Sequence, residues 1–167
     1  KSQVQIYRNL CREVMLRYKG YEVNVIGERF HFAFEGPISA TRFCLDLQLL
    51  LCDADWCLEL SDNPDTPMEL IRGSADKYLW RGLRVSMGID HGAATVVDPA
   101  SRTTSYSGRS VEVASLLQLM AVGGEILISA EVGAQVGGYV GTVAINEAGP
   151  KLQHYQHSKT QVRRLLP

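Results

Sequence analysis

A glycine followed by an acidic residue, Gly27-Glu28, separates two short runs in which apolar and polar residues alternate, 21–26 and 29–34. This alternation predicts a strand on each side, and the glycine predicts a tight turn between them. Because glycine leaves little side chain in the way, the turn can bring the Glu28 carboxylate to a sheet edge. A carboxylate placed there can bind Mg²⁺ over a nucleotide triphosphate, which makes Glu28 a candidate metal ligand.

The elements that position this turn follow from the spacing of apolar residues along the chain. Helical spacing predicts helices over 4–18, over 37–51 with a start at Pro37 or Ser39, and over 113–121. Alternation predicts strands over 83–89, 93–97, 125–129 and 160–165, with 93–97 as the hairpin partner of 83–89. The turn at Gly27 therefore lies between the first two predicted helices.

Residues 53–79 lack this periodicity and are rich in Asp, Asn, Pro, Ser and Gly. They predict a surface insertion with one helical turn near 68–72.

The chain of 167 residues is 46% hydrophobic and 21% charged, which predicts a single globular domain over 1–167. The element order predicts an α+β fold, a mostly antiparallel sheet with helices on one face. One strand ahead of Lys1 would complete a ferredoxin-like βαββαβ core, so we expect the first strand of that core to be missing from the chain.

Composition limits the classes of partner. A formal net charge of -1 gives no field that would favour nucleic acid or an anionic membrane, and Arg163-Arg164 is interpreted as a solvated edge. No apolar run approaches the roughly 20 residues of a membrane span, so we expect no direct membrane insertion. The four cysteines include no CxxC pair and are interpreted as reduced thiols, two of them in the core. His154 and His157 offer only a weak metal-binding pair.

Three blocks of sequence resemble one family in their order and spacing. GYEVNVIGERFHFAF (Gly20–Phe34), LWRGLRVSMGIDHG (Leu79–Gly92) and YSGRSVEVASLLQLMAVGGEILIS (Tyr106–Ser129) are similar to the catalytic domain of class III adenylate and guanylate cyclases. The likeness is strongest to trypanosomatid receptor-type adenylate cyclases, which also carry an insertion after a DW pair, here Asp55-Trp56. The resemblance covers about residues 7–131 and implies a cyclase-homology fold.

The resemblance also implies where a nucleotide and its metals would bind. Family members bind two metal ions with one carboxylate from the first strand and one from a Gly-Asp at the hairpin tip, where this chain has Glu28 followed by Arg29. Glutamate is one methylene longer than aspartate, and Mg²⁺ tolerates little departure from octahedral geometry. The purine-reading Lys and Asp of the family correspond to Asn24 and Ser105, which keep hydrogen-bonding groups but lose the charge.

The largest departure from the family lies on the third helix. Family members place an Asn and, four residues later, an Arg on one face, where both reach the ribose and triphosphate in the transition state. This chain has Glu112 and Leu116 at those positions. A carboxylate repels phosphate oxygens, and removal of one preorganised donor costs about 10² to 10³ in rate. We therefore expect Glu112 and Leu116 to be degenerate positions and no residue of the chain to be catalytic.

These features support one main hypothesis and two alternatives. The main hypothesis is a catalytically degenerate cyclase-like domain that needs no cofactor and acts as a dimerising regulatory or structural module in cyclic-nucleotide signalling or a flagellar assembly. It would form a homodimer, or a heterodimer with another cyclase-like domain, through the phenylalanine-bearing hairpin. The resemblance implies a cytoplasmic location, at a flagellum or at the cytoplasmic face of the plasma membrane.

The first alternative is an active adenylate cyclase half that converts ATP to cyclic AMP with Mg²⁺ when a second chain supplies the missing Asn and Arg. Glu28 would then be a metal ligand. The second alternative is a nucleotide-sensing domain that binds ATP without turnover through Asn24, Ser105 and Arg109. Calorimetry with ATP and Mg²⁺ separates the hypotheses.

Overall fold

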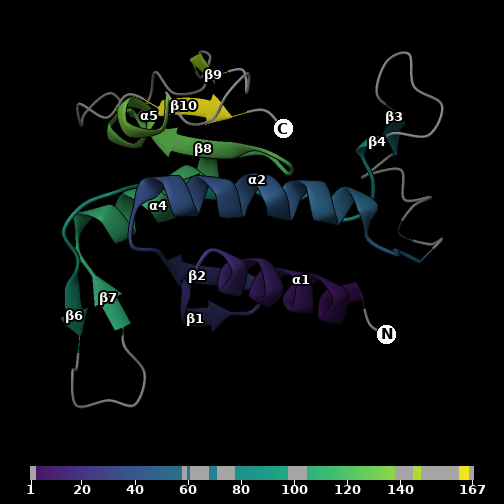
Figure 1. Cartoon of the computed structure of the whole chain (residues 1–167), viewed down its shortest axis with the longest axis horizontal. Coiled ribbons are helices and arrows are strands. Elements are labelled where there is room, and N and C mark those ends of the chain that lie inside the picture. The colour runs from purple at the N-terminus through teal and green to yellow at the C-terminus, as the bar shows by residue number, and fades with distance from the viewer. Residues whose placement is uncertain are drawn as a thin grey trace.

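The structure is a computed structural model that describes residues 3–57, 60, 68–70, 78–97, 105–137, 145–147 and 162–165 (Figure 1). The first half contains α1 (Gln3–Arg17), β1 (Tyr21–Ile26), β2 (Arg29–Ala33), α2 (Pro37–Asp53), β3 (Glu69–Leu70) and β4 (Tyr78–Trp80). The second half contains β5 (Met87–Ile89), β6 (Thr95–Val97), β7 (Ser105–Ser107), α4 (Arg109–Met120), β8 (Ile126–Ser129), α5 (Ala130–Val136), β9 (Ile145–Glu147) and β10 (Val162–Leu165). The mixture of helices and mostly antiparallel strand pairs confirms the α+β class.

The predicted helix–hairpin–helix unit is confirmed. Gly27 adopts a positive φ of 63°, which glycine tolerates without strain, and β1 pairs antiparallel with β2 across this turn. Proline stands at the start of α2, where its fixed φ suits the first helical turn and its missing N–H costs nothing. The buried faces of the two helices then pack together, with Val14 of α1 and Leu47 of α2 almost fully enclosed.

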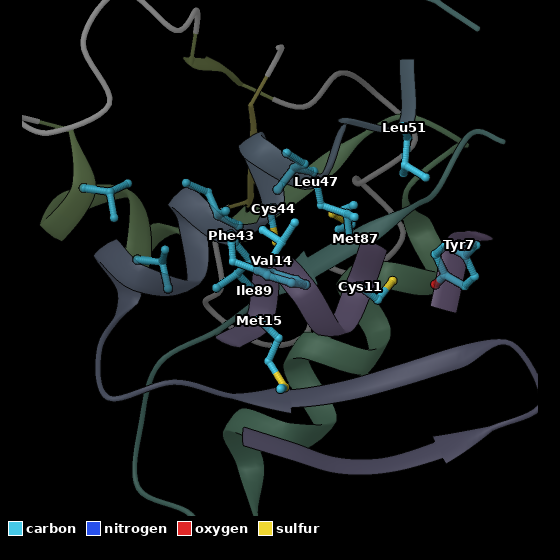
Figure 2. Packing of buried hydrophobic residues seen from close by; sticks show 14 of the residues in the cluster. Tyr7, Cys11, Val14, Met15, Phe43, Cys44, Leu47, Leu51, Met87 and Ile89 are labelled. Atoms are coloured by element: carbon cyan, nitrogen blue, oxygen red, sulfur yellow. The ribbon is translucent and has the colours of Figure 1, made fainter. Parts of the chain in front are cut away.

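Figure 2 shows the core that this packing creates. Phe43, Cys44 and Leu47 of α2 gather around Val14 of α1, beside Ile89 of β5. Burying such a side chain contributes about 1.5 to 3 kcal/mol relative to leaving it in water. The core therefore joins the N-terminal helix pair to strand β5.

The three hairpin phenylalanines are partly buried and pack against this core. Phe30 meets Tyr7 edge-on with ring centroids 5.6 Å apart, and Phe32 meets Phe43 at 5.1 Å. Phe34 also lies 5.1 Å from the Phe43 ring. The rings pack on the chain's own helices but stay partly exposed, so the expectation that this hairpin makes a dimer contact stays a prediction.

Two predicted strand relationships are corrected. The strand predicted over 83–89 is confined to Met87–Ile89, and it pairs in parallel with β8 instead of forming a hairpin with 93–97. Thr95–Val97 pairs with Ser105–Ser107 as the separate β6–β7 hairpin. All four residues of β8 are buried, so β8 behaves as a central strand, and α4 provides the crossover that a parallel pair requires.

The helices cover both faces of this central pair, which corrects the prediction of helices on one face. Met87 and Ile89 face the core formed with α1 and α2. Gly88, between them, points the other way, where an added Cβ would meet the backbone of Ala114 and Gln118 on α4. Side chains alternate across a strand, so α4 packs on the opposite face from α2. The continuous apolar run of β8 provides an apolar surface for both layers.

Smaller differences lie near the insertion and the C-terminal tail. Glu69 and Leu70 form strand β3 against β4, in place of the helical turn predicted around them. Helix α5 was not predicted; it begins after Ser129, whose hydroxyl accepts a hydrogen bond from the Val132 N–H and caps the helix. The strand predicted over 160–165 is confirmed as β10, but it pairs with both β8 and β9, so 163–164 lie on an interior strand and not at an edge.

Among the residues that the structure describes, no helix is both long enough and apolar enough to cross a lipid bilayer.

Candidate functional site

The hairpin tip holds Glu28 next to the first turns of α1. The Arg8 guanidinium lies 3.2 Å from the Glu28 carboxylate and also donates to the Gly27 carbonyl at 3.2 Å. The Tyr7 hydroxyl donates to the Glu28 carbonyl at 3.2 Å. The candidate metal ligand is therefore already paired with a cation. That cation, Arg8, comes from α1 and not from the neighbouring residue Arg29.

The tip offers a poor donor set for divalent metal. The Glu28 side chain is 55% exposed and forms an ion pair with Arg8. Across the described residues, no group of three or more His, Cys, Asp or Glu side chains is placed to hold a metal ion. The residues present here do not fit a two-metal site, because Mg²⁺ requires several hard oxygen ligands at near-octahedral positions.

The two purine-reading positions lie on different strands. Asn24 is exposed on β1 opposite His31, and Ser105 opens β7 and is half-buried. Strands β1 and β7 are in contact, so the hairpin that carries Ser105 lies near Asn24's strand. Neither residue is charged, and each can offer only hydrogen-bonding groups to a base.

Glu112 and Leu116 lie one turn apart on the exposed face of α4. Helix α4 begins after Gly108, and the Ser110 hydroxyl donates to the Ala93 carbonyl at 3.2 Å, which anchors its first turn. Glu112 occupies that first turn, where a negative charge is favoured by the helix dipole. Leu116 is 40% exposed. The carboxylate at Glu112 is therefore stabilised by its own helix, and Leu116 presents hydrocarbon to solvent.

A cavity of about 680 Å³ lies between the hairpin and β5. Its wall includes Tyr7 and Cys11 of α1, Asn24 of β1 and Ser115 of α4. Burial raises the pKa of the Cys11 thiol to about 12, although the hydrogen bond with Tyr7 acts in the opposite direction. Burial also raises the pKa of the Tyr7 hydroxyl above its ordinary value. Both groups are therefore neutral at physiological pH, and neither can act as a nucleophile or base there.

Of the predicted residues, Asn24 and Glu28 line the same cavity, whereas Ser105, Glu112 and Leu116 are not part of its lining. Glu28 is held by an ion pair with Arg8 of α1. Asn24 and Ser105 lie on two different hairpins, and Glu112 and Leu116 are exposed on α4. The important residue that sequence reasoning missed is Arg8. Its partner lies 20 residues away, so no local spacing could have indicated the ion pair.

Three comparisons with known proteins place these features in a family. The family model described as the adenylate and guanylate cyclase catalytic domain matches residues 4–155. An adenylate cyclase of Schizosaccharomyces pombe is 32% identical over 133 residues, which is 79% of this chain and 8% of that protein. A receptor-type adenylate cyclase of Trypanosoma brucei brucei is 27% identical over 143 residues, 75% of this chain and 12% of that protein. The chain thus spans only a small fraction of these relatives.

Solved structures agree on the fold. The monomeric adenylate cyclase structure from Trypanosoma brucei aligns with a TM-score of 0.78 at 23% identity, covering 98% of this chain and 78% of that one. The dimeric guanylyl cyclase domain of a RhoGC fusion protein from Blastocladiella emersonii aligns with a TM-score of 0.61 at 14% identity, covering 99% and 82%. Cyclase domains of this fold therefore occur as dimers in related structures. With its family-model match covering most of the chain, the protein belongs to the adenylate and guanylate cyclase catalytic domain family.

Proposed function

We propose that this domain is a catalytically degenerate class III nucleotidyl cyclase domain that acts as a dimerising regulatory or structural module in cyclic-nucleotide signalling. The observation that carries the proposal is the outward face of α4, which presents Glu112 and Leu116 one turn apart. By the family resemblance, these are the positions of the Asn and Arg that contact ribose and triphosphate. An acid and a hydrocarbon there cannot perform those roles.

The electrostatic consequence can be given a magnitude. A charge pair about 4 Å apart interacts by ~1 kcal/mol in water and ~4 kcal/mol near a protein surface, so Glu112 repels phosphate by an amount in this range. Replacing the Arg donor with Leu removes about 10² to 10³ in rate. Cyclisation requires attack of the ribose 3′-hydroxyl on the α-phosphate, and both effects raise the free energy of that step.

The hairpin tip supports the same conclusion. Arg8 pairs with Glu28, so a metal ion would have to displace a guanidinium before binding the carboxylate. Mg²⁺ also gives up its hydration water reluctantly. We therefore propose that the domain works without a metal cofactor.

The proposed contact for dimerisation is an apolar strip on and just after α4. Leu116, Leu119 and Val122 are all at least 40% exposed, and the first two share the helix face with Glu112. The hairpin phenylalanines offer less free apolar surface, because they pack partly against the chain's own core. The partner is a second copy or another cyclase-like domain, as the dimeric structure of the related RhoGC domain supports.

Turnover and assembly test the proposal separately. The purified domain, incubated with Mg²⁺ and ATP or GTP, should form no cyclic nucleotide above the blank, and light scattering should report a dimer. Leu119→Glu should convert the dimer to a monomer, whereas Leu49→Glu, at an equally exposed position on α2, should not. Sustained turnover by the domain alone would refute degeneracy, and a monomer at every concentration would refute the module.

Activity with a complementing chain is the first alternative. When the domain is mixed with an intact cyclase domain, the proposal expects no turnover beyond that of the intact domain. Turnover that appears only in the mixture and is abolished by Glu28→Ala would instead establish an active half with Glu28 as metal ligand.

Nucleotide binding without turnover is the second alternative, and one observation favours it. Asn24 is exposed and lines the 680 Å³ cavity, a volume in the range of small-molecule sites. Titration calorimetry with millimolar ATP and Mg²⁺ tests it, with Asn24→Ala as the matched variant.

Similarity to the trypanosome receptor-type cyclase also supports a cytoplasmic location beside a plasma or flagellar membrane, which an epitope-tagged parent protein would test.

A further inference from the structure

Strands β3 and β4, at the end of the predicted insertion, form a ribbon whose side chains meet Arg84. Glu69 of β3 pairs with Trp80 of β4, and in the described structure the ribbon is a sheet of its own (Figure 1). The Arg84 guanidinium donates to the Glu69 carboxylate at 2.7 Å. It also lies over the Trp80 ring, 5.5 Å from the centroid, as in a cation–π contact. Arg84 therefore contacts both strands of the ribbon.

Trp80 and Arg84 also cover the turn that follows α4. A Cβ at Gly124, whose φ is 91°, would overlap the Trp80 ring. A Cβ at Gly123 would lie only 2.9 Å from the Arg84 Cβ. Glycine has no side chain, so the two residues of the ribbon contact can lie directly on this turn.

Hydrogen bonds continue from Arg84 into the last turns of α4. The carbonyl of Val85, the next residue of the chain, accepts from the Gly124 N–H at 3.1 Å. The hydroxyl of Ser86 accepts from the Gln118 side chain of α4 at 2.7 Å. Segment 84–86 therefore contacts the ribbon on one side, and the end of α4 and its following turn on the other.

These contacts reach the apolar strip proposed for dimerisation. Leu119 directly follows Gln118 and is 58% exposed. Val122 directly precedes Gly123 and is 53% exposed. Because packed elements behave as close-packed solids, a displacement of the ribbon would be passed to both side chains.

We infer that the ribbon braces the C-terminal end of α4, and that Arg84 is a positioning residue through which the insertion strengthens the dimer contact. The inference rests on the proposed function, because it concerns the same strip on α4. With the pair of Arg84 and Glu69 intact, Leu119 and Val122 are held in the orientation that meets the partner. With the pair broken, association must order the end of the helix, and this entropic cost weakens the dimer.

Charge reversal on each side of the ion pair tests the brace. Glu69→Arg and Arg84→Glu each bring like charges together, whereas the double variant restores an opposite pair. Because the pair is partly exposed, each single variant should raise the dissociation constant of the dimer by about threefold to tenfold. The double variant should return it to within about twofold of the unmodified chain. Sedimentation velocity over a concentration series measures these constants.

Hydrogen exchange followed by mass spectrometry tests the route through α4. A peptide over 118–126 should exchange faster in both single variants, including in the Leu119→Glu background, where the domain is expected to be monomeric. The matched control is Glu13→Arg, which breaks an exposed ion pair with Arg17 on α1. It should change neither the exchange nor the dissociation constant. The two single variants alter net charge in opposite directions, so a loss shared by both cannot come from net charge.

Each failure has a separate meaning. An unchanged dissociation constant in both single variants, or no recovery in the double variant, would overturn the brace. Weaker dimers without faster exchange over 118–126 would overturn the route through α4. If charge reversal prevents folding, the milder Glu69→Gln should still shift both readouts in the same direction. A chain that is monomeric at every concentration would refute the proposed dimer, while exchange in the Leu119→Glu background would still decide whether the ribbon holds α4.

Discussion

The Arg8 guanidinium lies 3.2 Å from the Glu28 carboxylate and reaches the Gly27 carbonyl as well. This contact ties the first turns of α1 to the hairpin tip. It also pairs the Glu28 carboxylate with a cation from the chain's own first helix.

The Arg8–Glu28 pair should contribute little to stability. Glu28→Gln should lower the free energy of unfolding by less than about 1 kcal/mol, because a partly exposed ion pair is screened by water. Urea unfolding at low and high salt measures this effect, and the loss should shrink at high salt. Glu13→Gln, which removes an exposed i,i+4 pair with Arg17, is the matched control. A salt-independent loss above about 2 kcal/mol would contradict an exposed, solvated pair.

Gly88 tests whether α4 packs directly on β5. In Gly88→Ala the new Cβ meets the backbone of Ala114 and Gln118, which cannot rotate aside, so α4 must shift. Overpacking of this kind costs about 1 to 3 kcal/mol. Gly36→Ala, with no atom within 4 Å of its new Cβ, should cost less than about 1 kcal/mol. Equal thermal unfolding midpoints for the two variants would contradict direct packing of α4 on β5 at Gly88.

Neighbouring leucines on α2 test the assignment of its buried face. Leu47 is 2% exposed and Leu49 is 55% exposed. Leu47→Ala should therefore lower the free energy of unfolding by about 2 to 5 kcal/mol, through lost burial and a residual cavity. Leu49→Ala should change it by less than about 0.5 kcal/mol. Chemical denaturation of both variants measures the difference, and a reversed order would mean that the helix is rotated.

Glu112 and Leu116 should be replaceable without loss of the fold. Glu112→Asn should cost about 0.3 to 1 kcal/mol, because it removes a favourable charge from the first turn of α4. Leu116→Arg should change stability by less than about 0.5 kcal/mol in the monomer, because the side chain is exposed and both residues favour helices.

The double variant restores the family residues on α4, but the tip and purine positions remain altered. We therefore expect it to form no cyclic nucleotide either. Restored turnover in this variant would show that α4 alone accounts for the degeneracy.

Buried thiols should make the domain sensitive to alkali. Burial raises the pKa of Cys11 from 9.0 to about 12, so the folded state keeps a proton that the unfolded chain releases. This contribution is complete below pH 9 and is lost as pH rises from 9 towards 12. At a pH of about 10 the loss from one such thiol is about 1 kcal/mol. Urea unfolding at neutral pH and at this pH measures it, and Cys11→Ala should lose less between the two.

The sequence predicted the elements whose periodicity is local and strong. The helix that buries Tyr7, Cys11 and Val14 and the turn at Gly27 were both predictable, because spacing and turn chemistry act over a few residues. Strand β8 was recognisable as a short apolar run.

Pairing between distant strands could not be predicted in the same way. Gly88 of β5 and Leu127 of β8 are paired residues in the parallel ladder. The sequence near either residue does not indicate which strand it pairs with. The run from Leu83 to Ile89 alternates as a strand should, yet only Met87–Ile89 pairs. The packing of Phe32 on Phe43 could not be predicted either, since alternation indicates an apolar face but not what packs against it.

The residues of the candidate site could be predicted from the sequence, but their contacts and exposure could not. Resemblance located Glu28, and only the fold revealed that Arg8 holds it. The outward face of Glu112 and Leu116 followed from helical spacing, while their exposure depends on what α4 packs against.

Strand β10, at 162–165, lies between β8 and β9. During synthesis on the ribosome, the four-stranded sheet cannot close until residue 165 has emerged from the exit tunnel, although α1 and the hairpin are already outside. Until that moment one edge of β8 stays unpaired in the nascent chain, and a chaperone that shields it would protect the growing polypeptide from aggregation.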